Sequence, residues 1–210
     1  MTIELWLAFA TASVVMLLIP GPTILTVISY SVAHGKKANI PLVLAVALGD
    51  STALALSLLG LGALLATSSS WFLVIKWAGG LYLLYLGVKL LKAGVTNAEI
   101  VDAPVKLGST WRLFANTWLV TALNPKGIVF FVAFLPQFLN PEEPAFGQLW
   151  ILSLTFVVLA ALNATLYAVF AGTARRLLTS AVAQKRFNLA GGSMLSIAGL
   201  WALTAKQPAT

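Results

Sequence analysis

The chain has 210 residues, of which 60% are hydrophobic and 9% are charged, and its mean hydropathy is +0.94. Soluble domains carry about 25% charged residues, so this composition excludes a soluble globular protein and predicts a membrane protein. Cysteine is absent and His34 is the single histidine, which excludes disulfides, thiolate metal sites and cysteine nucleophiles. The net charge of +7 does not indicate a nucleic-acid partner, because the basic residues lie between apolar runs.

Six apolar stretches are long enough to cross a bilayer and predict an all-α integral membrane protein. We expect the first to be retained, because it lacks the basic amino-terminal region of a signal peptide and is too long for one. The connectors are too short for a soluble domain, so residues 1–210 should form one transmembrane domain. The stretches are about Ile3–Ala33, Ile40–Ala66, Trp71–Leu91, Leu113–Phe138, Leu149–Gly172 and the shorter Leu189–Ala205.

The first stretch contains its own interruption, "LIPGPT" at 18–23. Pro20 and Pro22 lack an N–H, Ile19 is pushed out of the α region by the proline after it, and Gly21 tolerates the resulting backbone. We therefore expect the helix to stop near Leu18 and to restart at Pro22 as a half-helix. Unpaired backbone groups at membrane depth must face a cavity or other protein groups, so the break predicts a binding site more than a packing kink.

A second interruption, "LNPKG" at 123–127, lies in the fourth stretch. Asn124 can cap a half-helix that begins at Pro125. The first and fourth spans should therefore both be interrupted helices.

The third and sixth stretches resemble each other at an offset of 112 residues, as "AGGLYLLYLG" (78–87) and "AGGSMLSIAG" (190–199). Two three-span halves, about 3–94 and 113–206, would then have opposite orientations, as in many secondary transporters. The offset places Pro22 nearer to "LPQF" (135–138) than to Pro125, so the symmetry mate of the first break stays open. The glycines predict close helix packing, including a dimer face and hence a homo-oligomer, rather than ligand contact; they are Gly79, Gly80, Gly87, Gly191, Gly192 and Gly199.

Lys and Arg residues gather around alternate connectors. The first, third and fifth connectors are basic, whereas the fourth contains Glu142 and Glu143 and no basic residue. The positive-inside rule therefore predicts that both termini face away from the cytoplasm.

Two charged residues, Asp50 and Lys126, lie inside the predicted spans. They could form a structural ion pair, or Lys126 could reach the membrane surface, but intramembrane charges more often line a transport pathway. Asn163 lies beside the position that the 112-residue offset assigns to Asp50. A zwitterionic amino acid would find positive potential at the half-helix N-termini and Lys126, and acceptors for its ammonium group at Asp50, Asn163 and the carbonyls freed before each break.

The "PGP" of the first stretch, the Gly-Asp pair of the second, "GGLYLLYLGVKLLKAG" and above all "NPKGIVFFVAFLPQF" resemble the LysE/RhtB superfamily of amino-acid exporters, in particular its homoserine/threonine/leucine branch. The resemblance covers nearly the whole chain. It implies a bacterial inner-membrane exporter that moves small amino acids or related metabolites outward by proton antiport. In such a membrane the positive-inside rule places both termini in the periplasm, and we expect no cofactor. The residues that fall on the motif positions of the superfamily are Pro20, Gly21, Pro22, Asp50, Asn124, Pro125 and Lys126.

Three other classes of function were weighed. A membrane hydrolase needs a nucleophile with a base or a metal cluster, which one histidine and no cysteine do not supply. A divalent-metal exporter needs several metal ligands within the membrane. This sequence offers one intramembrane carboxylate and no His or Cys cluster, and it places a lysine there as well. A passive channel is the hardest alternative to exclude from the sequence.

Overall fold

The computed structural model spans the chain and describes residues 1–67, 74, 77, 80, 81, 84, 85, 87–89, 91, 92, 109–140 and 142–204. Every element within these residues is a helix, which confirms the all-α class. Three runs are long and apolar enough to cross a membrane, Pro22–Gly60, Thr110–Phe138 and Ala145–Val169, and Ile3–Leu18 is a shorter apolar helix.

The helices follow the predicted apolar stretches closely. In chain order they are α1 (Ile3–Leu18), α2 (Pro22–His34), the short 3-10 helix η1 (Gly35–Ala38), α3 (Asn39–Thr67), α5 (Thr110–Ala122), α6 (Pro125–Val129), the π-helical turn η2 (Phe130–Phe134), the 3-10 turn η3 (Leu135–Phe138), α7 (Ala145–Val169), α8 (Ala171–Thr179) and α9 (Ala181–Thr204).

Two of the predicted spans need correction and one lies partly outside the described residues. The fifth ends at Val169, after which α8 begins as a separate helix. The sixth, short apolar stretch is part of a longer helix, because α9 already begins at Ala181, in the polar segment before it. Described residues of the third are helical, whereas Trp71, Gly79 and the connector after it lie outside the described residues.

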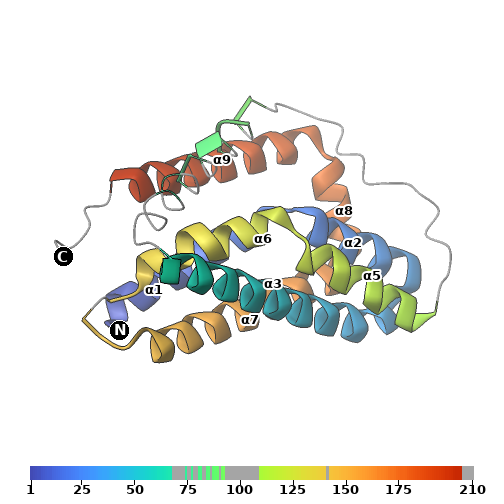
Figure 1. Cartoon of the computed structure of the whole chain (residues 1–210). Helices are drawn as coiled ribbons and strands as arrows, with labels where there is room; N and C mark the ends of the chain where they lie inside the picture. The colour runs from blue at the N-terminus through green and yellow to red at the C-terminus, as the bar shows by residue number, and fades with distance from the viewer. Residues whose placement is uncertain are drawn as a thin grey trace.

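The elements lie lengthwise beside one another (Figure 1). The start of α1, the end of α3, the start of α7 and the end of α9 lie at one end of the molecule, on the left of Figure 1. The end of α2, the start of α5 and α8 lie at the opposite end. The long helix α3, from the amino-terminal part of the chain, packs on both α5 and α7, which come from its carboxy-terminal part.

Both proline interruptions are present where the sequence predicts them. Helix α1 ends at Leu18, and α2 begins at Pro22 after an extended Gly21. Helix α6 begins at Pro125, and the Asn124 side chain caps it by accepting a hydrogen bond from the backbone N–H of Lys126. Pro22 and Pro125 thus hold the same first position of a half-helix.

A further irregularity follows α6, because residues 130–134 form a π-helical turn. The N–H of Leu135 donates to the carbonyl of Phe130, five residues earlier, and Pro136 then lacks the next donor. π-helical turns are rare and occur mostly at functional sites. The turn directs the aromatic residues of "FFVAFLPQF" toward α1 and α7.

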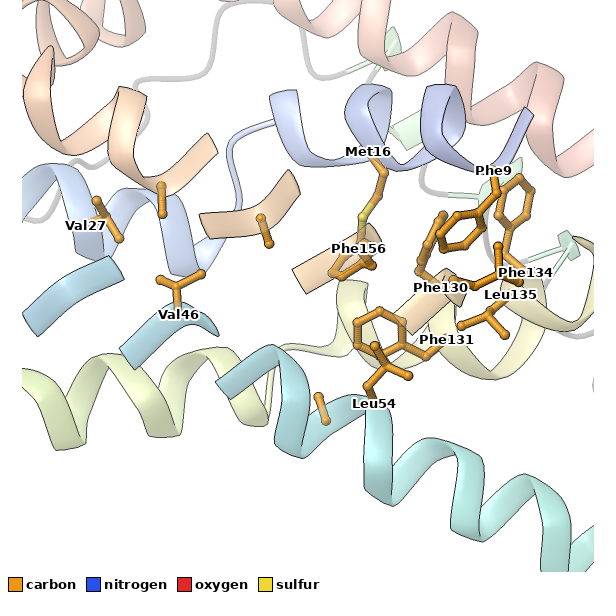
Figure 2. Close-up of a cluster of buried hydrophobic side chains, with 14 of the residues drawn as sticks. Phe9, Met16, Val27, Val46, Leu54, Phe130, Phe131, Phe134, Leu135 and Phe156 are labelled. Carbon is orange, nitrogen blue, oxygen red and sulfur yellow. The ribbon is translucent and has the colours of Figure 1, made fainter. Parts of the chain in front are cut away.

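These aromatic residues form the centre of the main core (Figure 2). The Phe130 ring lies 6.0 Å from Phe9 of α1 and 5.5 Å from Phe156 of α7, and Phe131 meets Phe156 edge to face at 4.7 Å. Figure 2 shows Phe9 and Phe130 on one side of Met16, and Val27 of α2 and Val46 of α3 on the other.

Glycines bring the described residues of the third stretch against α9. A Cβ added at Gly87 would lie 2.8 Å from the carbonyl oxygen of Gly192, and one added at Gly199 would lie 2.8 Å from that of Gly80. Both distances are closer than real Cβ contacts, so the two backbones touch directly. Because Gly80 and Gly192, and Gly87 and Gly199, are each 112 residues apart, the two contacts are reciprocal.

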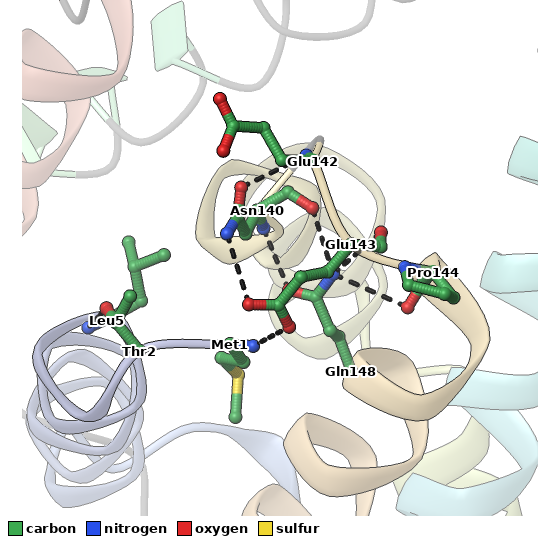
Figure 3. A network of polar contacts seen from close by, with 8 residues as sticks. All are labelled: Met1, Thr2, Leu5, Asn140, Glu142, Glu143, Pro144 and Gln148. Atoms are coloured by element: carbon green, nitrogen blue, oxygen red, sulfur yellow. Dashed lines mark hydrogen bonds and ion pairs between the residues drawn. The ribbon is translucent and has the colours of Figure 1, made fainter.

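A polar network connects the start of α1 to the turn before α7 (Figure 3). The amino group of Met1 contacts Glu143, and this hydrogen bond is the main reason why the pKa of the Glu143 carboxyl is lowered from 4.5. The Gln148 side chain, at the start of α7, donates to the carbonyl of Asn140 and accepts from its N–H. The first residue therefore lies on the same end of the molecule as the acidic fourth connector.

Candidate functional site

A small cavity lies where the two interruptions meet. It encloses about 30 Å³, which is room for one or two water molecules. Its wall comes from both interrupted spans and from α3 and α7. The lining residues are Met16, Leu17, Gly21, Thr23, Ile24, Val46, Asp50, Asn124, Lys126, Gly127, Phe156, Ala160 and Asn163.

The carbonyls freed at the end of α1 are bonded by side chains from other spans. The Lys126 ammonium group donates to the carbonyls of Met16 (2.9 Å) and Ile19 (2.6 Å). The Leu17 carbonyl accepts from the Asn163 amide at 3.2 Å, and the Leu18 carbonyl accepts from the Tyr167 hydroxyl at 3.0 Å. These carbonyls are predicted acceptors for a substrate ammonium group, and two of them are already bonded to Lys126.

The two half-helix N-termini also meet at the cavity. Asn124, which caps α6 through its Oδ1, donates from Nδ2 to the hydroxyl of Thr23 in the first turn of α2 at 3.1 Å. Gly21 has no side chain, so no capping side chain protects the start of α2 itself. The N–H groups of Thr23 and Ile24 have no intrahelical acceptor at this position, which leaves positive potential beside the cavity.

Asp50 supplies the negative charge of the site. It lies on α3, is 7% exposed and borders the same cavity as the interrupted spans. Its charge interacts with that of Lys126, but within the described residues its carboxylate forms neither a hydrogen bond nor an ion pair. A buried carboxylate without a hydrogen-bond donor is ready to accept one from a ligand.

The structure brings Gly21, Asp50, Asn124, Lys126 and Asn163 together around one cavity. Three motif prolines, Pro20, Pro22 and Pro125, do not line the cavity. They determine where the helices end and begin, and so where the backbone groups of the cavity lie. The glycines 80, 87, 192 and 199 lie in a separate helix contact.

Sequence reasoning missed two polar side chains of the site. Tyr167 lies one turn after Asn163 on α7 and hence on the same helix face, which is the signal that could have found it. Thr23 directly follows the Pro-Gly-Pro segment, at the position where a half-helix exposes its first N–H groups.

No metal site is indicated within the described part of the chain, where no group of three or more His, Asp or Glu side chains comes together. Asp50 is the single carboxylate among the cavity residues. The site is instead made of one carboxylate, one ammonium group, two amides, a hydroxyl and backbone dipoles. Such a mixed lining suits a small ligand that carries both charges.

A family model described as "LysE type translocator" matches residues 14–206. The chain belongs to this family. The homoserine/homoserine lactone efflux protein of Salmonella typhimurium is 31% identical to this translocator over 207 residues, which cover 99% of the chain and 100% of the relative. The leucine efflux proteins of Salmonella choleraesuis (30% over 155 residues, 72% of both chains) and Klebsiella pneumoniae (31% over 157 residues, 74% of this chain and 73% of the relative) are also similar. No solved structure matches the translocator.

Membership of the LysE type translocators makes this chain a multi-pass membrane transporter and not an enzyme. The matched residues 14–206 include both interruptions and every residue that lines the cavity.

Proposed function

We propose that this translocator exports small amino acids from the cytoplasm across a bacterial inner membrane, as a secondary transporter that takes up protons in exchange. The observation that carries the proposal is the cavity at the junction of the two interrupted spans, where Asp50, Lys126 and the start of α2 surround one small space. Interrupted helices that meet at membrane depth are the usual binding sites of secondary transporters.

The charges suit an amino acid. The uncapped N-terminus of α2 attracts the carboxylate, and Asp50 and the α1 carbonyls attract the ammonium group. An amino acid is much larger than about 30 Å³, so binding must widen the cavity. Transport by alternating access requires such a rearrangement in any case.

The names of the relatives support ammonium recognition as the common requirement. Homoserine and leucine carry both an ammonium and a carboxylate group, whereas a homoserine lactone retains the ammonium group without a free carboxylate. The ammonium group is the charged group that all three compounds share. The acceptors that we assign to it are the carbonyls at the end of α1, with the charge of Asp50, which is buried and without a donor among the described residues, nearby in the same cavity.

Asp50 is also the group that we assign to the proton. If it is protonated from outside once the substrate has left, and deprotonates inward as the next substrate binds, proton uptake drives export. Within this scheme both termini face the periplasm, as the basic first, third and fifth connectors suggest. The reciprocal glycine contacts support two inverted halves.

A substrate-panel efflux assay tests the proposal. Cells that express the chain and cells with an empty vector are loaded with leucine, threonine, homoserine, lysine and, separately, with divalent metals. We expect export of one or more neutral amino acids against their gradient. Metal efflux would establish a metal exporter, and loss of every small solute only down its gradient would establish a passive channel; either result would refute amino-acid antiport.

A further inference from the structure

The Lys126 ammonium group lies at an unusual place for a residue expected to attract a carboxylate. Its two hydrogen bonds go to the carbonyl oxygens of Met16 and Ile19, at the negative end of α1. It passes beside Gly21, and a Cβ there would lie 3.6 Å from Nζ. The position is thus an ammonium-binding subsite made of backbone oxygens.

An amino acid presents the same chemical group. Its α-ammonium and the lysine ε-ammonium both offer three N–H donors and one positive charge. Two carbonyl oxygens that hold the lysine group at 2.9 and 2.6 Å will accept bonds from an α-ammonium equally well. The two groups cannot occupy the same oxygens together.

Lysine also has a second partner within the cavity. Its flexible four-carbon stem allows Nζ to move, and the Asp50 carboxylate borders the same space without a donor among the described residues. A lysine displaced from α1 would therefore find a compensating charge. The Asn163 and Tyr167 bonds to Leu17 and Leu18 would hold the end of α1 in place meanwhile.

We propose that Lys126 is a built-in substitute for the ammonium group of the substrate: it occupies the Met16 and Ile19 carbonyls when no amino acid is bound, and the substrate must displace it to bind. This inference rests on the proposed function, since it names which atoms of the site take the ammonium group. It makes Lys126 a competitor of the substrate rather than the anchor of its carboxylate. It also gives the unloaded translocator an internal cation with which to close its site.

Whether Lys126 competes with the substrate or anchors its carboxylate is decided by the direction in which substrate affinity changes when the lysine is replaced. Lys126→Met keeps most of the apolar stem and removes the ammonium group. Because the substrate no longer has to break the two charge-assisted hydrogen bonds of Lys126, release of the subsite should tighten binding about tenfold or more. An anchor would weaken binding by a similar factor when removed.

The measurement is calorimetric titration of the purified full chain in nanodiscs with leucine and with homoserine lactone as probes. Lys36→Met, on the exposed η1, is the matched control and should leave the dissociation constants unchanged. We expect Lys126→Met to bind both probes more tightly but to export them more slowly, because the internal cation is missing from the return step. Weaker or unchanged binding by Lys126→Met overturns the inference while leaving the proposed function intact.

A second measurement does not depend on the substrate. Lys126→Ala opens the space of the side chain, and n-propylammonium should then raise its thermal unfolding temperature, whereas tetramethylammonium, which has no N–H donor, should not. Wild type should show a smaller difference at the same concentrations, because propylammonium there has to displace Lys126 from the subsite. Equal effects of the two cations on Lys126→Ala would refute the subsite even if amino-acid export is established. Failure of wild type to bind any probe, together with a positive propylammonium result, would refute the proposed function but retain the subsite.

Discussion

Gly49 directly precedes Asp50 on α3 and lies against α5. A Cβ at this position would lie 2.6 Å from the Cβ of Thr121 and 3.0 Å from the carbonyl oxygen of Trp118. The absence of a side chain therefore lets α3 and α5 approach each other next to the buried carboxylate. Gly60 of the same helix has no atom within 4 Å of an added Cβ and faces open space.

Gly49→Ala should lower the thermal unfolding temperature, because overpacking a close contact costs about 1–3 kcal/mol. Gly60→Ala is the matched control and should preserve or raise it, since alanine is favoured over glycine within a helix by about 1 kcal/mol. Thermal unfolding of both variants in the same detergent measures the difference. Equal behaviour of the two variants would show that the α3–α5 contact is looser than described.

Asp50→Asn should abolish proton-driven accumulation but retain exchange of substrate across the membrane. Asparagine keeps the size and much of the hydrogen bonding of aspartate but cannot take up a proton. Accumulation under an imposed pH gradient and counterflow at equal pH, both in proteoliposomes, separate the two activities.

Wild-type protein in the same vesicles is the control for that experiment. If Asp50→Asn still accumulates substrate in response to the gradient, Asp50 is structural and the proton binds elsewhere. If both activities disappear, Asp50 is needed for substrate binding itself.

The interrupted helices show what sequence can predict at the level of elements. Proline lacks an N–H whatever surrounds it, so the end at Leu18 and the starts at Pro22 and Pro125 follow from local chemistry. The π-helical turn at 130–134 depends on the packing of Phe130 and Phe131 against α1 and α7, and no local pattern gives it. The same holds for the Lys126 bonds, which join residues more than 100 positions apart.

Replacing both Pro20 and Pro22 with alanine should reduce export far more than it reduces the amount of folded protein. The change lets the helix run on and removes the free N-terminus and the carbonyl acceptors at the cavity. Export rate divided by the membrane level of the protein is the quantity to compare.

Pro41→Ala is the matched control, because Pro41 lies in the first turn of α3, where its missing N–H removes no helix bond. It should transport normally. Normal export by the double variant would show that the first interruption is only a kink.

The arrangement of the whole molecule has a consequence for sidedness. The start of α1, the end of α9 and the acidic turn at 140–144 lie at one end of the molecule, and η1, α8 and the start of α5 at the other (Figure 1). Basic residues such as Lys36 and Arg175 belong to the second end. Among the connectors that the structure describes, charge and position in the fold therefore agree, although the sequence alone could not show which of them are neighbours.

A reporter fused after Thr210 that is active only in the cytoplasm should stay silent, because the positive-inside rule assigns the basic end to the cytoplasm. The same reporter inserted after Lys37 should be active and serves as the positive control. Reporter activity at Thr210 would show that the chain crosses the membrane one time fewer than predicted, and that its two halves do not have opposite orientations.

The reciprocal contacts of Gly80 with Gly199 and of Gly87 with Gly192 obey the rule for an isologous interface between subunits. In such an interface residue i of one subunit meets residue j of the other, and j meets i. Each residue of this contact on α9 corresponds to the residue 112 positions earlier in the third stretch. Gly192 then corresponds to Gly80 and Gly199 to Gly87, so the pair Gly80 and Gly87 meets its own equivalents. The backbone nitrogens of Leu84 and Ser196, which lie beside these glycines, correspond in the same way. This one helix contact therefore follows, within a single polypeptide, the pairing rule of a homodimer interface, and a side chain added at Gly87 or at Gly199 would meet equivalent backbone atoms.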